Sequence, residues 1–469
     1  MYIGLRQSVW FDEAFSIMIA KKPLSELIRL TSVDTHPPLY YLILKSWAGL
    51  FGWGEFALRS LSALAAAGVV IFSGLLVKRA FGNRTALVSL PFIVFAPFLL
   101  RYGFEIRMYA IVSLIGIVAT YVLVLAMETR SGRRQWLLYS IYAILVALGV
   151  YMLYYSVLLW FAHLIWLTYV AHKNKQPIIK SKWMIAYIGS VILFLPWLPT
   201  FLRQITNGAL APISQALTID NLVGIVSFST VYQPTWQLSP IISLVVLFAI
   251  ISIVYFSIQA FKHISRKQKP YLMLLAFYVL VPISIIAVVS IFRPMYVERY
   301  ISHIIIGGYI FLGVVVALST YNKSSMIEWA VAGLLFATLL FGTIQLSQTG
   351  NFNFQRLQKP TVNDVAGSIP RCDDDSIVLA AGPYEAIELS YYLPNCQLHF
   401  YSKTAELSGG YAALSNSRLR TANPTTQFIN TKRLAYVYYG QPELEMPLSF
   451  KKIDEKTFGS MHVATFVDN

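Results

Sequence analysis

Apolar stretches close to 20 residues long recur along most of this 469-residue chain, and they limit its fold more than any other feature. A helix of about that length crosses the apolar interior of a lipid bilayer. In water, so many such stretches would leave more apolar surface than a soluble fold can cover, since 57% of the residues are apolar and only 13% charged. The chain is therefore predicted to be an α-helical polytopic membrane protein.

We expect about ten membrane-spanning helices, which together make residues 56–349 a transmembrane helical domain. They are predicted at 56–78, 86–100, 108–127, 136–151, 153–170, 183–201, 241–261, 271–291, 301–319 and 326–346. Residues 1–55 are too often interrupted by charges to span. They are predicted to form amphipathic helices at the membrane surface, with an apolar side made by Phe15, Ile19, Leu24, Leu27, Ile28 and Leu30.

The basic residues of the loops are unevenly placed, and this predicts the orientation of the chain. Lys and Arg gather on alternate connections, in clusters such as Lys78–Arg84, Arg130–Arg134, 173–182 and 262–269. Cytoplasmic loops carry such an excess, so the other connections, residues 1–55 and the tail are predicted to face outward. The net charge of +15 is thus spread between spans, which argues against a nucleic-acid-binding face.

The pattern changes in residues 350–469. Short runs rich in β-branched and aromatic residues predict strands at 377–381, 397–401, 434–439 and 462–466, separated by helical or turn-rich pieces such as 383–392. We expect a small soluble α/β domain on the extracytoplasmic side. Both cysteines of the chain, Cys372 and Cys396, lie in it and either form a disulfide or remain two buried thiols.

Asp12 and Glu13 stand side by side in W-F-D-E-A-F-S at 10–16. Next to Trp10 and Phe11 they would lie in a medium of low dielectric constant, as a base poised near neutral pH requires. Alternatively, both acids simply begin a helix, because carboxylates are favourable in a first turn. The residues alone leave these two interpretations open.

Asp34 and His36 belong to D-T-H-P-P-L-Y-Y at 34–41. Pro37 and Pro38 fix two φ angles and keep His36 out of helical geometry, so the imidazole is presented in a predetermined place. The alternative is that the two prolines only start a helix.

Two further groups are predicted at the outer ends of spans, namely Glu105 with Arg107 and Arg299 with Tyr300. An arginine in such a place is either an anchor at the membrane interface or a bidentate ligand of a phosphate group. Carboxylates, a histidine and such arginines on one side of a membrane indicate a site for a lipid-borne anionic substrate.

The order of these motifs resembles the bacterial and archaeal C-type glycosyltransferases of the family 39 type. These include aminoarabinose transferases and dolichyl-phosphate-mannose protein mannosyltransferases. The resemblance rests on W-F-D-E-A-F-S, D-T-H-P-P-L-Y-Y, L-F-G-W-G-E-F-A-L-R-S-L-S-A at 50–63, F-E-I-R-M-Y at 104–109 and V-E-R-Y at 297–300. It covers most of the membrane part and leaves the tail out.

The resemblance implies that a hexose or pentose passes from a polyprenyl-phosphate donor to an acceptor hydroxyl on a protein, a glycolipid or a cell-wall glycan. The reaction would take place at the outer face of the cell membrane. The implied general base is Asp12, and the implied catalytic site also holds Glu13, Asp34, His36 and Glu105.

From charge and position we add Arg107, Arg299 and Tyr300 as ligands of the donor phosphate. A divalent metal ion is a further hypothesis, with Glu13, Asp34 and His36 as candidate ligands; no other cofactor is expected.

The chain departs from the family in one respect. Members usually have a transmembrane helix ahead of the Asp-Glu loop, whereas only residues 1–9 precede Trp10. We therefore expect the natural start to lie upstream, which would add a span and a cytoplasmic N-terminus.

Two other classes of protein compete with the enzyme. A transporter or flippase would place ionisable residues at mid-membrane, but most predicted spans lack interior charges. A membrane anchor that presents its tail for protein binding would not need the groups around Asp12 and His36.

Overall fold

The computed structural model describes residues 7–468 apart from 131, 180, 207–214, 323–324, 351–360, 371, 408, 416, 425–427, 429–430, 443, 445 and 447–448. The chain forms two compact units. The helical unit comprises Arg59–Arg203 and Ile213–Thr349, and the mixed unit comprises Tyr2–Leu58, Gln204–Pro212 and Gly350–Asn469. The first and last parts of the sequence thus fold together.

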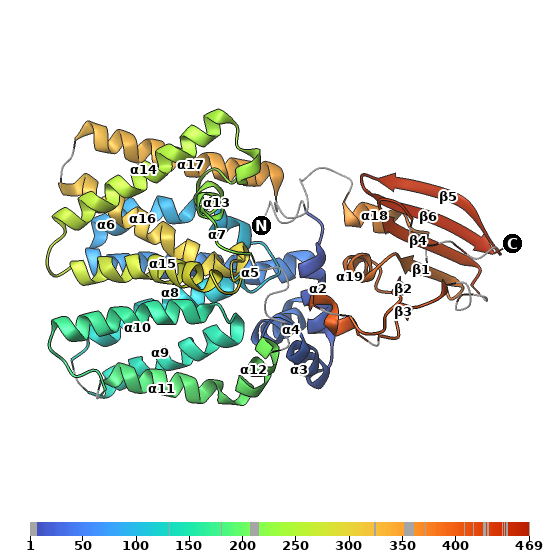
Figure 1. Cartoon of the computed structure of the whole chain (residues 1–469), viewed down its shortest axis with the longest axis horizontal. Helices are drawn as coiled ribbons and strands as arrows, with labels where there is room; N and C mark the ends of the chain where they lie inside the picture. The colour runs from blue at the N-terminus through green and yellow to red at the C-terminus, as the bar shows by residue number, and fades with distance from the viewer. Residues whose placement is uncertain are drawn as a thin grey trace. The chain divides into compact units, whose positions relative to one another are not determined.

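The helical unit is made of long helices that lie side by side (Figure 1). They are α5 (Glu55–Phe81), α6 (Asn83–Val94), α7 (Pro97–Tyr102), α8 (Tyr109–Glu128), α9 (Arg133–Met152), α10 (Ser156–Lys173), α11 (Lys182–Phe194), α12 (Leu198–Thr206), α13 (Ile219–Thr230), α14 (Pro240–His263), α15 (Lys269–Ser290), α16 (Ser302–Asn322) and α17 (Met326–Thr349). Short 3₁₀ turns join some of them, at Leu195–Trp197, Thr235–Gln237 and Glu298–Ile301.

Among the described residues, eight helical segments are long and apolar enough to cross a membrane. The polytopic helical class is therefore confirmed, with fewer full-length spans than the ten expected. The span expected at 86–100 is divided into α6 and α7, because the first helix ends at Val94 and Pro97 begins the next. The span expected at 153–170 is helical as α10, which carries the polar residues His163, His172 and Lys173.

Helix α16 lies at the centre of the helical unit, packed against α6, α8, α14 and α15. Glycines allow this close packing. A Cβ atom at Gly307 would lie 2.3 Å from the ring of Tyr278, and one at Gly313 would lie 2.9 Å from the backbone of Ser89. The outer helices expose large apolar side chains instead, among them Leu87, Ile188, Val191, Leu244 and Leu280. Such an apolar surface suits lipid.

The mixed unit begins with three helices, α2 (Phe11–Lys21), α3 (Leu24–Val33) and α4 (Leu39–Phe51). Phe15 and Ile19 of α2 are buried, as are Leu27 and Leu30 of α3, whereas Leu24 is 59% exposed. The residues expected on one apolar side therefore mostly lie inside. They pack within the protein itself.

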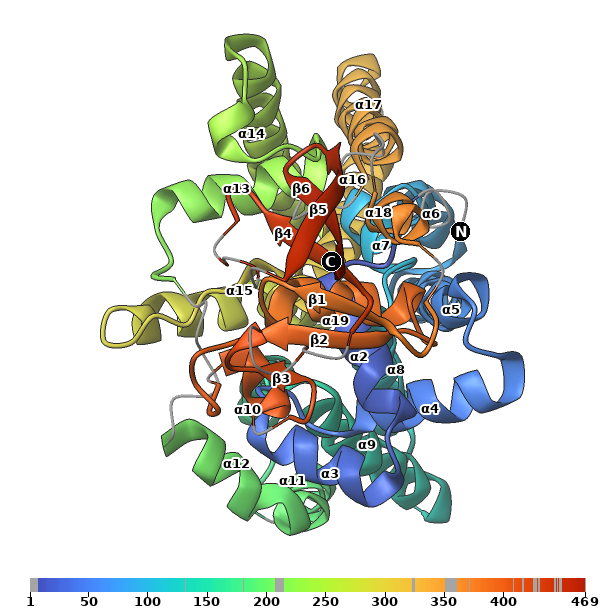
Figure 2. The same ribbon diagram turned by 90° about the vertical axis from the view of Figure 1, so that its right-hand side faces the viewer.

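The second part of the mixed unit is an α/β fold with one six-stranded sheet (Figures 1 and 2). Its helices are α18 (Val362–Ser368) and α19 (Pro383–Tyr392). Its strands are β1 (Ser376–Ala380), β2 (Gln397–Tyr401), β3 (Arg420–Thr421), β4 (Arg433–Tyr439), β5 (Phe450–Phe458) and β6 (Met461–Asp468).

The strand order is β3-β2-β1-β4-β6-β5. Strands β3, β2, β1 and β4 are parallel, and β6 and β5 continue the sheet antiparallel. In the centre Ile377 pairs with Gln397 on one side and with Leu434 on the other. Helix α19 is the crossover between the parallel strands β1 and β2.

The α/β fold expected in the tail is confirmed, and the four predicted strands and the helix at 383–392 are present. Strand β5 was not predicted. It reads F-K-K-I-D-E-K-T-F and exposes charged side chains along its length at the edge of the sheet. Charges are typical of edge strands, where they discourage pairing with another chain.

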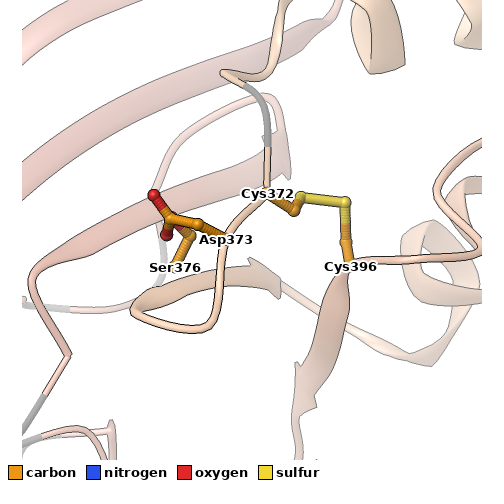
Figure 3. Close-up of a disulfide and its surroundings, with 4 residues drawn as sticks. All are labelled: Cys372, Asp373, Ser376 and Cys396. Carbon is orange, nitrogen blue, oxygen red and sulfur yellow. A yellow bond between two sulfur atoms is a disulfide. The ribbon is translucent and has the colours of Figure 1, made fainter.

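Cys372 and Cys396 form a disulfide, the first of the two alternatives left open by the sequence (Figure 3). Their Cα atoms lie 5.3 Å apart. The bond joins the chain before β1 to the chain before β2, and nearby the Ser376 hydroxyl donates a hydrogen bond to Asp373. It therefore holds together the starts of two adjacent parallel strands.

Candidate active site

Asp12 and Glu13 occupy the first turn of α2, as the helix-start interpretation predicts, and both are buried. Glu13 Oε2 accepts a hydrogen bond from the backbone N–H of Trp10 at 3.4 Å, which caps the helix. Ser16 Oγ donates to the backbone carbonyl of Asp12 at 2.8 Å and braces the same turn. Glu13 thus has a structural task, and the role of Asp12 as a base stays a prediction.

The structure brings Asp34 and His36 together. Helix α3 ends at Val33, and Asp34 adopts an extended backbone before Pro37 and Pro38 lead into α4. His36 Nδ1 lies 3.6 Å from Asp34 Oδ2, and both side chains are buried. Thr35 Oγ1 lies 2.7 Å from the same ring nitrogen. The Pro-Pro pair therefore does more than start a helix, because it holds an imidazole beside a carboxylate.

Two further residues form hydrogen bonds with Asp34 at the connection between α3 and α4. The Tyr41 hydroxyl donates to Asp34 Oδ2 at 3.3 Å from the first turn of α4. Gln204, the seventh residue of α12, donates through Nε2 to the backbone carbonyls of Asp34 at 2.7 Å and Thr31 at 3.0 Å. Tyr41 belongs to the motif D-T-H-P-P-L-Y-Y, so its short distance in sequence from Asp34 could have indicated this contact. Gln204 is 170 residues away and had none.

The soluble domain also contributes to the surroundings of Asp12, which the sequence did not suggest. Helix α19 packs against α2 within the mixed unit (Figures 1 and 2). The Phe11 ring stacks on the Tyr384 ring with centroids 4.7 Å apart and planes 1° apart. Asp12 follows Phe11 directly, so the domain reaches the helix turn that carries the predicted base.

In the helical unit, Glu105 and Arg107 lie in the loop between α7 and α8, and both are buried. The loop is tightly turned, since the N–H of Arg107 donates to the carbonyl of Glu105 at 2.8 Å. Ser62 of α5 also donates to that carbonyl, at 2.5 Å. These bonds fix the backbone, and the carboxylate of Glu105 lies close enough to Arg101 for electrostatic interaction.

Arg101 was not singled out in the sequence, yet it is 1% exposed and central to this end of the helical unit. Its Nη1 lies 3.3 Å from Oε1 of Glu298, and its guanidinium group lies 5.0 Å from the ring centroid of Tyr102. This ion pair joins the end of α7 to the turn Glu298–Ile301. A cation with a carboxylate 197 residues away gives no local sequence signal.

Arg299 and Tyr300 belong to the same turn. The Tyr300 ring packs edge-on against that of Tyr155, with centroids 5.2 Å apart, and the Tyr155 hydroxyl donates to the carbonyl of Met295 at 2.5 Å. The guanidinium group of Arg299 lies 5.9 Å from the Tyr300 ring centroid. The two loops that carry Glu105, Arg107, Arg299 and Tyr300 therefore share one end of the helical unit.

No group of three or more His, Cys, Asp and Glu side chains is placed to hold a metal ion within the part of the chain that the structure describes. Glu13, Asp34 and His36 therefore do not come together as a three-ligand site. Asp34 and His36 pair with each other, whereas Glu13 is engaged in capping α2. The candidate residues fall into two groups. The mixed unit holds Asp12, Glu13, Asp34 and His36, and the helical unit holds Glu105, Arg107, Arg299 and Tyr300.

The sequence profile described as dolichyl-phosphate-mannose-protein mannosyltransferase matches residues 35–200. The match begins inside the D-T-H-P-P motif and ends in α12, so it includes Glu105 and Arg107. No curated protein matches the sequence of the chain.

Two solved structures of ArnT from Cupriavidus metallidurans share the fold. The apo form has 12% sequence identity and a TM-score of 0.62, and the match covers 98% of this chain and 94% of that one. The form bound to undecaprenyl phosphate also has 12% identity, with a TM-score of 0.63 and a coverage of 99% and 95%. The shared fold includes the soluble domain, since nearly the whole of both chains is covered. The profile match over residues 35–200 and the shared fold agree with the family resemblance, and the chain is a polytopic membrane protein that shares its fold with ArnT.

Proposed function

We propose that the chain is an integral membrane glycosyltransferase that moves a sugar from a polyprenyl-phosphate donor to an acceptor hydroxyl group. The observation that carries this proposal is that ArnT, whose fold extends over nearly the whole chain, has been solved with undecaprenyl phosphate bound. The profile match to dolichyl-phosphate-mannose-protein mannosyltransferases supports the same donor class. The sugar is a hexose or pentose, and the acceptor is a protein, a glycolipid or a cell-wall glycan.

In the proposed reaction Asp12 is the general base. Its carboxylate takes the proton of the acceptor hydroxyl as the acceptor oxygen bonds to the anomeric carbon of the sugar. The bond between that carbon and the phosphate oxygen breaks, and polyprenyl phosphate leaves with the electron pair. The position of Asp12 in a buried, capped first turn supports its role as the base, because the backbone that carries Asp12 is fixed.

Arg107 and Arg299 are the proposed ligands of the donor phosphate, with Tyr300 as a hydroxyl partner. The leaving phosphate gains negative charge in the transition state, and a guanidinium group offers two parallel N–H donors to it. The ion pair of Arg101 with Glu298 supports this assignment, because it fixes the turn that carries Arg299. Arg101 itself then holds this turn in position and adds positive charge at this end of the helical unit.

The remaining acids are assigned supporting roles, each within its own unit. In the mixed unit, Asp34 and His36, buried as a pair, are suited to orient the acceptor, and Glu13 maintains the helix start beside Asp12. In the helical unit, Glu105 lies in the loop that carries Arg107, where its charge interacts with Arg101.

The reaction is proposed to take place on the extracytoplasmic face. The basic clusters fall on alternate loops of the helical unit, which supports a cytoplasmic location for those loops. The disulfide Cys372–Cys396 supports an oxidising compartment for the soluble domain.

The test is sugar transfer by membranes that contain the full chain, incubated with labelled polyprenyl-phosphate sugars that differ in sugar and in polyprenol length. We expect one donor to lose its sugar to a membrane or protein acceptor, with release of polyprenyl phosphate. Movement of intact donor across the bilayer without release of polyprenyl phosphate would instead assign the chain to the flippases. Membranes with the Asp12→Asn variant serve as the matched blank.

A further inference from the structure

Helix α4 of the mixed unit is apolar along nearly its whole length, and its two sides have different surroundings. One side is buried and is made of residues three or four positions apart, namely Tyr40, Tyr41, Leu44 and Ala48. The opposite side, which we call the open face of α4, is half-buried or exposed and is made of Leu42, Ile43, Ser46, Trp47 and Leu50. The helix therefore presents apolar side chains in both directions.

The one charged residue of α4, Lys45, is turned away from the open face. Its Nζ donates hydrogen bonds to the backbone carbonyls of Ala20 at 3.1 Å and Lys22 at 2.8 Å. Both carbonyls lie at the end of α2, where backbone carbonyls have no partner within the helix. The open face is consequently left without a charge, and such an apolar surface on a folded protein marks a contact with a partner or a membrane.

The chain leads from the open face directly into a membrane helix. Helix α4 ends at Phe51, and α5 begins at Glu55 and is long and apolar enough to cross a membrane (Figure 2). Trp47 Nε1 donates to the backbone carbonyl of Ala57, in the first turn of α5, at 2.7 Å. The open face thus lies beside the end of α5, which is where a spanning helix meets the surface of the bilayer.

The residues between α4 and α5 have the character of a membrane interface. Leu50 is 78% exposed, Phe51 58% and Phe56 61%. Lys21 Nζ lies 5.6 Å from the centroid of the Trp53 ring. Tryptophan is enriched at the level of the lipid headgroups, and lysine near helix ends extends its charge to the same level. Apolar and aromatic side chains therefore continue from the open face to the first turn of α5.

Helix α3 provides the contrast within the same unit. Its exposed residues include Ser25 and the charged Arg29, and its Glu26 pairs with Lys22 at 3.4 Å. Charges on the outer side of a helix suit water. Two consecutive helices of similar length thus present different surfaces, a charged one on α3 and an uncharged, apolar one on α4.

We propose that the open face of α4, continued by Phe51 and Phe56, is a membrane-contact surface that lies on the lipid leaflet in which α5 begins. Its aliphatic side chains would enter the boundary between headgroups and acyl chains, as those of helices lying in the membrane plane do. The apolar side expected on α2 and α3 packs inside the protein, and the membrane contact falls on the next helix.

This inference goes beyond the proposed function and holds whether or not the chain transfers a sugar. Helix α2 packs against α4 within the mixed unit, so a helix held on the lipid also fixes the distance of α2 from the membrane surface. A lipid-borne substrate presents its headgroup at that surface.

The test measures lipid contact with a nitroxide spin label on the full chain in vesicles of phosphatidylethanolamine and phosphatidylglycerol. Both native cysteines form the disulfide, so the label attaches to one introduced cysteine. Ser46→Cys places it on the open face of α4, and Ser25→Cys is the matched control on α3, since both serines are exposed. We expect the label at 46 to collide with oxygen, which dissolves in lipid, and to be shielded from a water-soluble nickel chelate. The ratio of the two collision rates should be several-fold higher than at 25.

Two results would overturn the proposal. A label at 46 that collides with the nickel chelate as often as the label at 25 would show that the open face is in water. A label at 46 that is shielded from oxygen as well as from nickel would show that protein, such as a second copy of the chain, covers the face.

A tryptophan variant keeps the proposal testable if a label at residue 46 disturbs the fold. Brominated lipids quench the fluorescence of tryptophans that touch acyl chains. Trp47→Phe removes the indole of the open face, whereas Trp10→Phe removes one that is 4% exposed. The share of fluorescence that brominated lipid quenches should fall in Trp47→Phe and not in Trp10→Phe. An unchanged share in Trp47→Phe would contradict the contact of α4 with lipid.

Discussion

The helical unit and the mixed unit carry different halves of the candidate chemistry. The arginines lie in the helical unit, where a buried ion pair between Arg101 and Glu298 joins two loops. The proposed base lies in the mixed unit, on helix α2, against which helix α19 of the soluble domain packs. The arginines lie near helix ends and in short connections, at the end of α7, between α7 and α8 and in the turn Glu298–Ile301. Fixing a proton acceptor requires a turn anchored at several points. The two units should therefore respond differently to substitution.

The largest expected effect is that of Asp12→Asn in the mixed unit. The change keeps the shape of the side chain and removes its ability to accept a proton, so kcat should fall by about 10²- to 10⁴-fold with little change in the KM of the donor. Steady-state transfer assays on the purified full chain measure both. Glu26→Gln is the control, because Glu26 is partly exposed and pairs with Lys22, which lies four residues earlier between α2 and α3. A variant of Asp12 with normal kcat would remove the base from the mixed unit.

Removal of the disulfide tests whether the stability of the mixed unit depends on its cross-link. Cys372→Ser opens a loop with a sequence separation of 24. The soluble domain should lose roughly 3 kcal/mol of unfolding free energy, since the unfolded chain regains the freedom of that loop. The unfolding free energy is measured by denaturant unfolding of the full chain, with proteolysis of the soluble domain as the readout. Reductant should reproduce the loss of stability in the wild-type chain and have no effect on the variant. Equal stability of the wild type and the variant, with and without reductant, would show that the disulfide does not stabilise the domain.

The pH dependence of the mixed unit should reveal Glu388. Burial raises the pKa of Glu388 to about 7 in the folded chain, above the ordinary value of 4.5. The stabilising contribution of the protonated group is then fully present below about pH 4.5 and is lost as the pH rises through about 7, by up to about 2 to 3 kcal/mol. The facing groups are Tyr439, Tyr384 and Glu385.

Unfolding of wild type and Glu388→Gln between pH 5 and 8.5 isolates this group, because every other titration is common to both. The difference in unfolding free energy between the two proteins should shift in favour of the variant as the pH rises. A difference that does not vary with pH would mean that Glu388 is ionised over the whole range.

The smallest expected effect is that of Arg299→Ala in the helical unit. Loss of one charged hydrogen-bond donor to phosphate should raise the KM of the donor about tenfold and leave kcat closer to normal. Arg293→Ala is the matched control, because Arg293 is exposed in the same connection. If Arg299→Ala lowered kcat and left the KM unchanged, the two units would not differ as proposed.

Much of the architecture could be predicted because its signals are local. Apolar runs of helical length located the spans, and short β-branched and aromatic runs located β1, β2, β4 and β6. The non-helical backbone before Pro37 and Pro38 also followed from neighbouring residues, whereas the contact of His36 with Asp34 was found only in the structure. A helix start at the Asp-Glu pair was one of the two interpretations that the sequence left open, and the structure places both acids in the first turn of α2.

The failures have physical reasons as well. Strand β5 was missed because its sequence is mostly charged. An exposed edge strand needs few apolar residues, so it lacks the pattern that predicts a strand. The break between α6 and α7 depends on Pro97, which starts a helix as readily as it ends one. Gln204 and Arg101 find their partners 170 and 197 positions away, where no periodicity reaches.

The sequence by itself determined the class of the protein and the places of most helices and strands, and it supplied the candidate residues of the proposed site. Hydrophobic period and composition are properties of neighbouring residues, so they can be read along the chain. Only the tertiary structure decided that α19 packs against α2 and that Arg101 pairs with Glu298. Such contacts depend on which surfaces pack together, and packing is set by the shape of the whole unit.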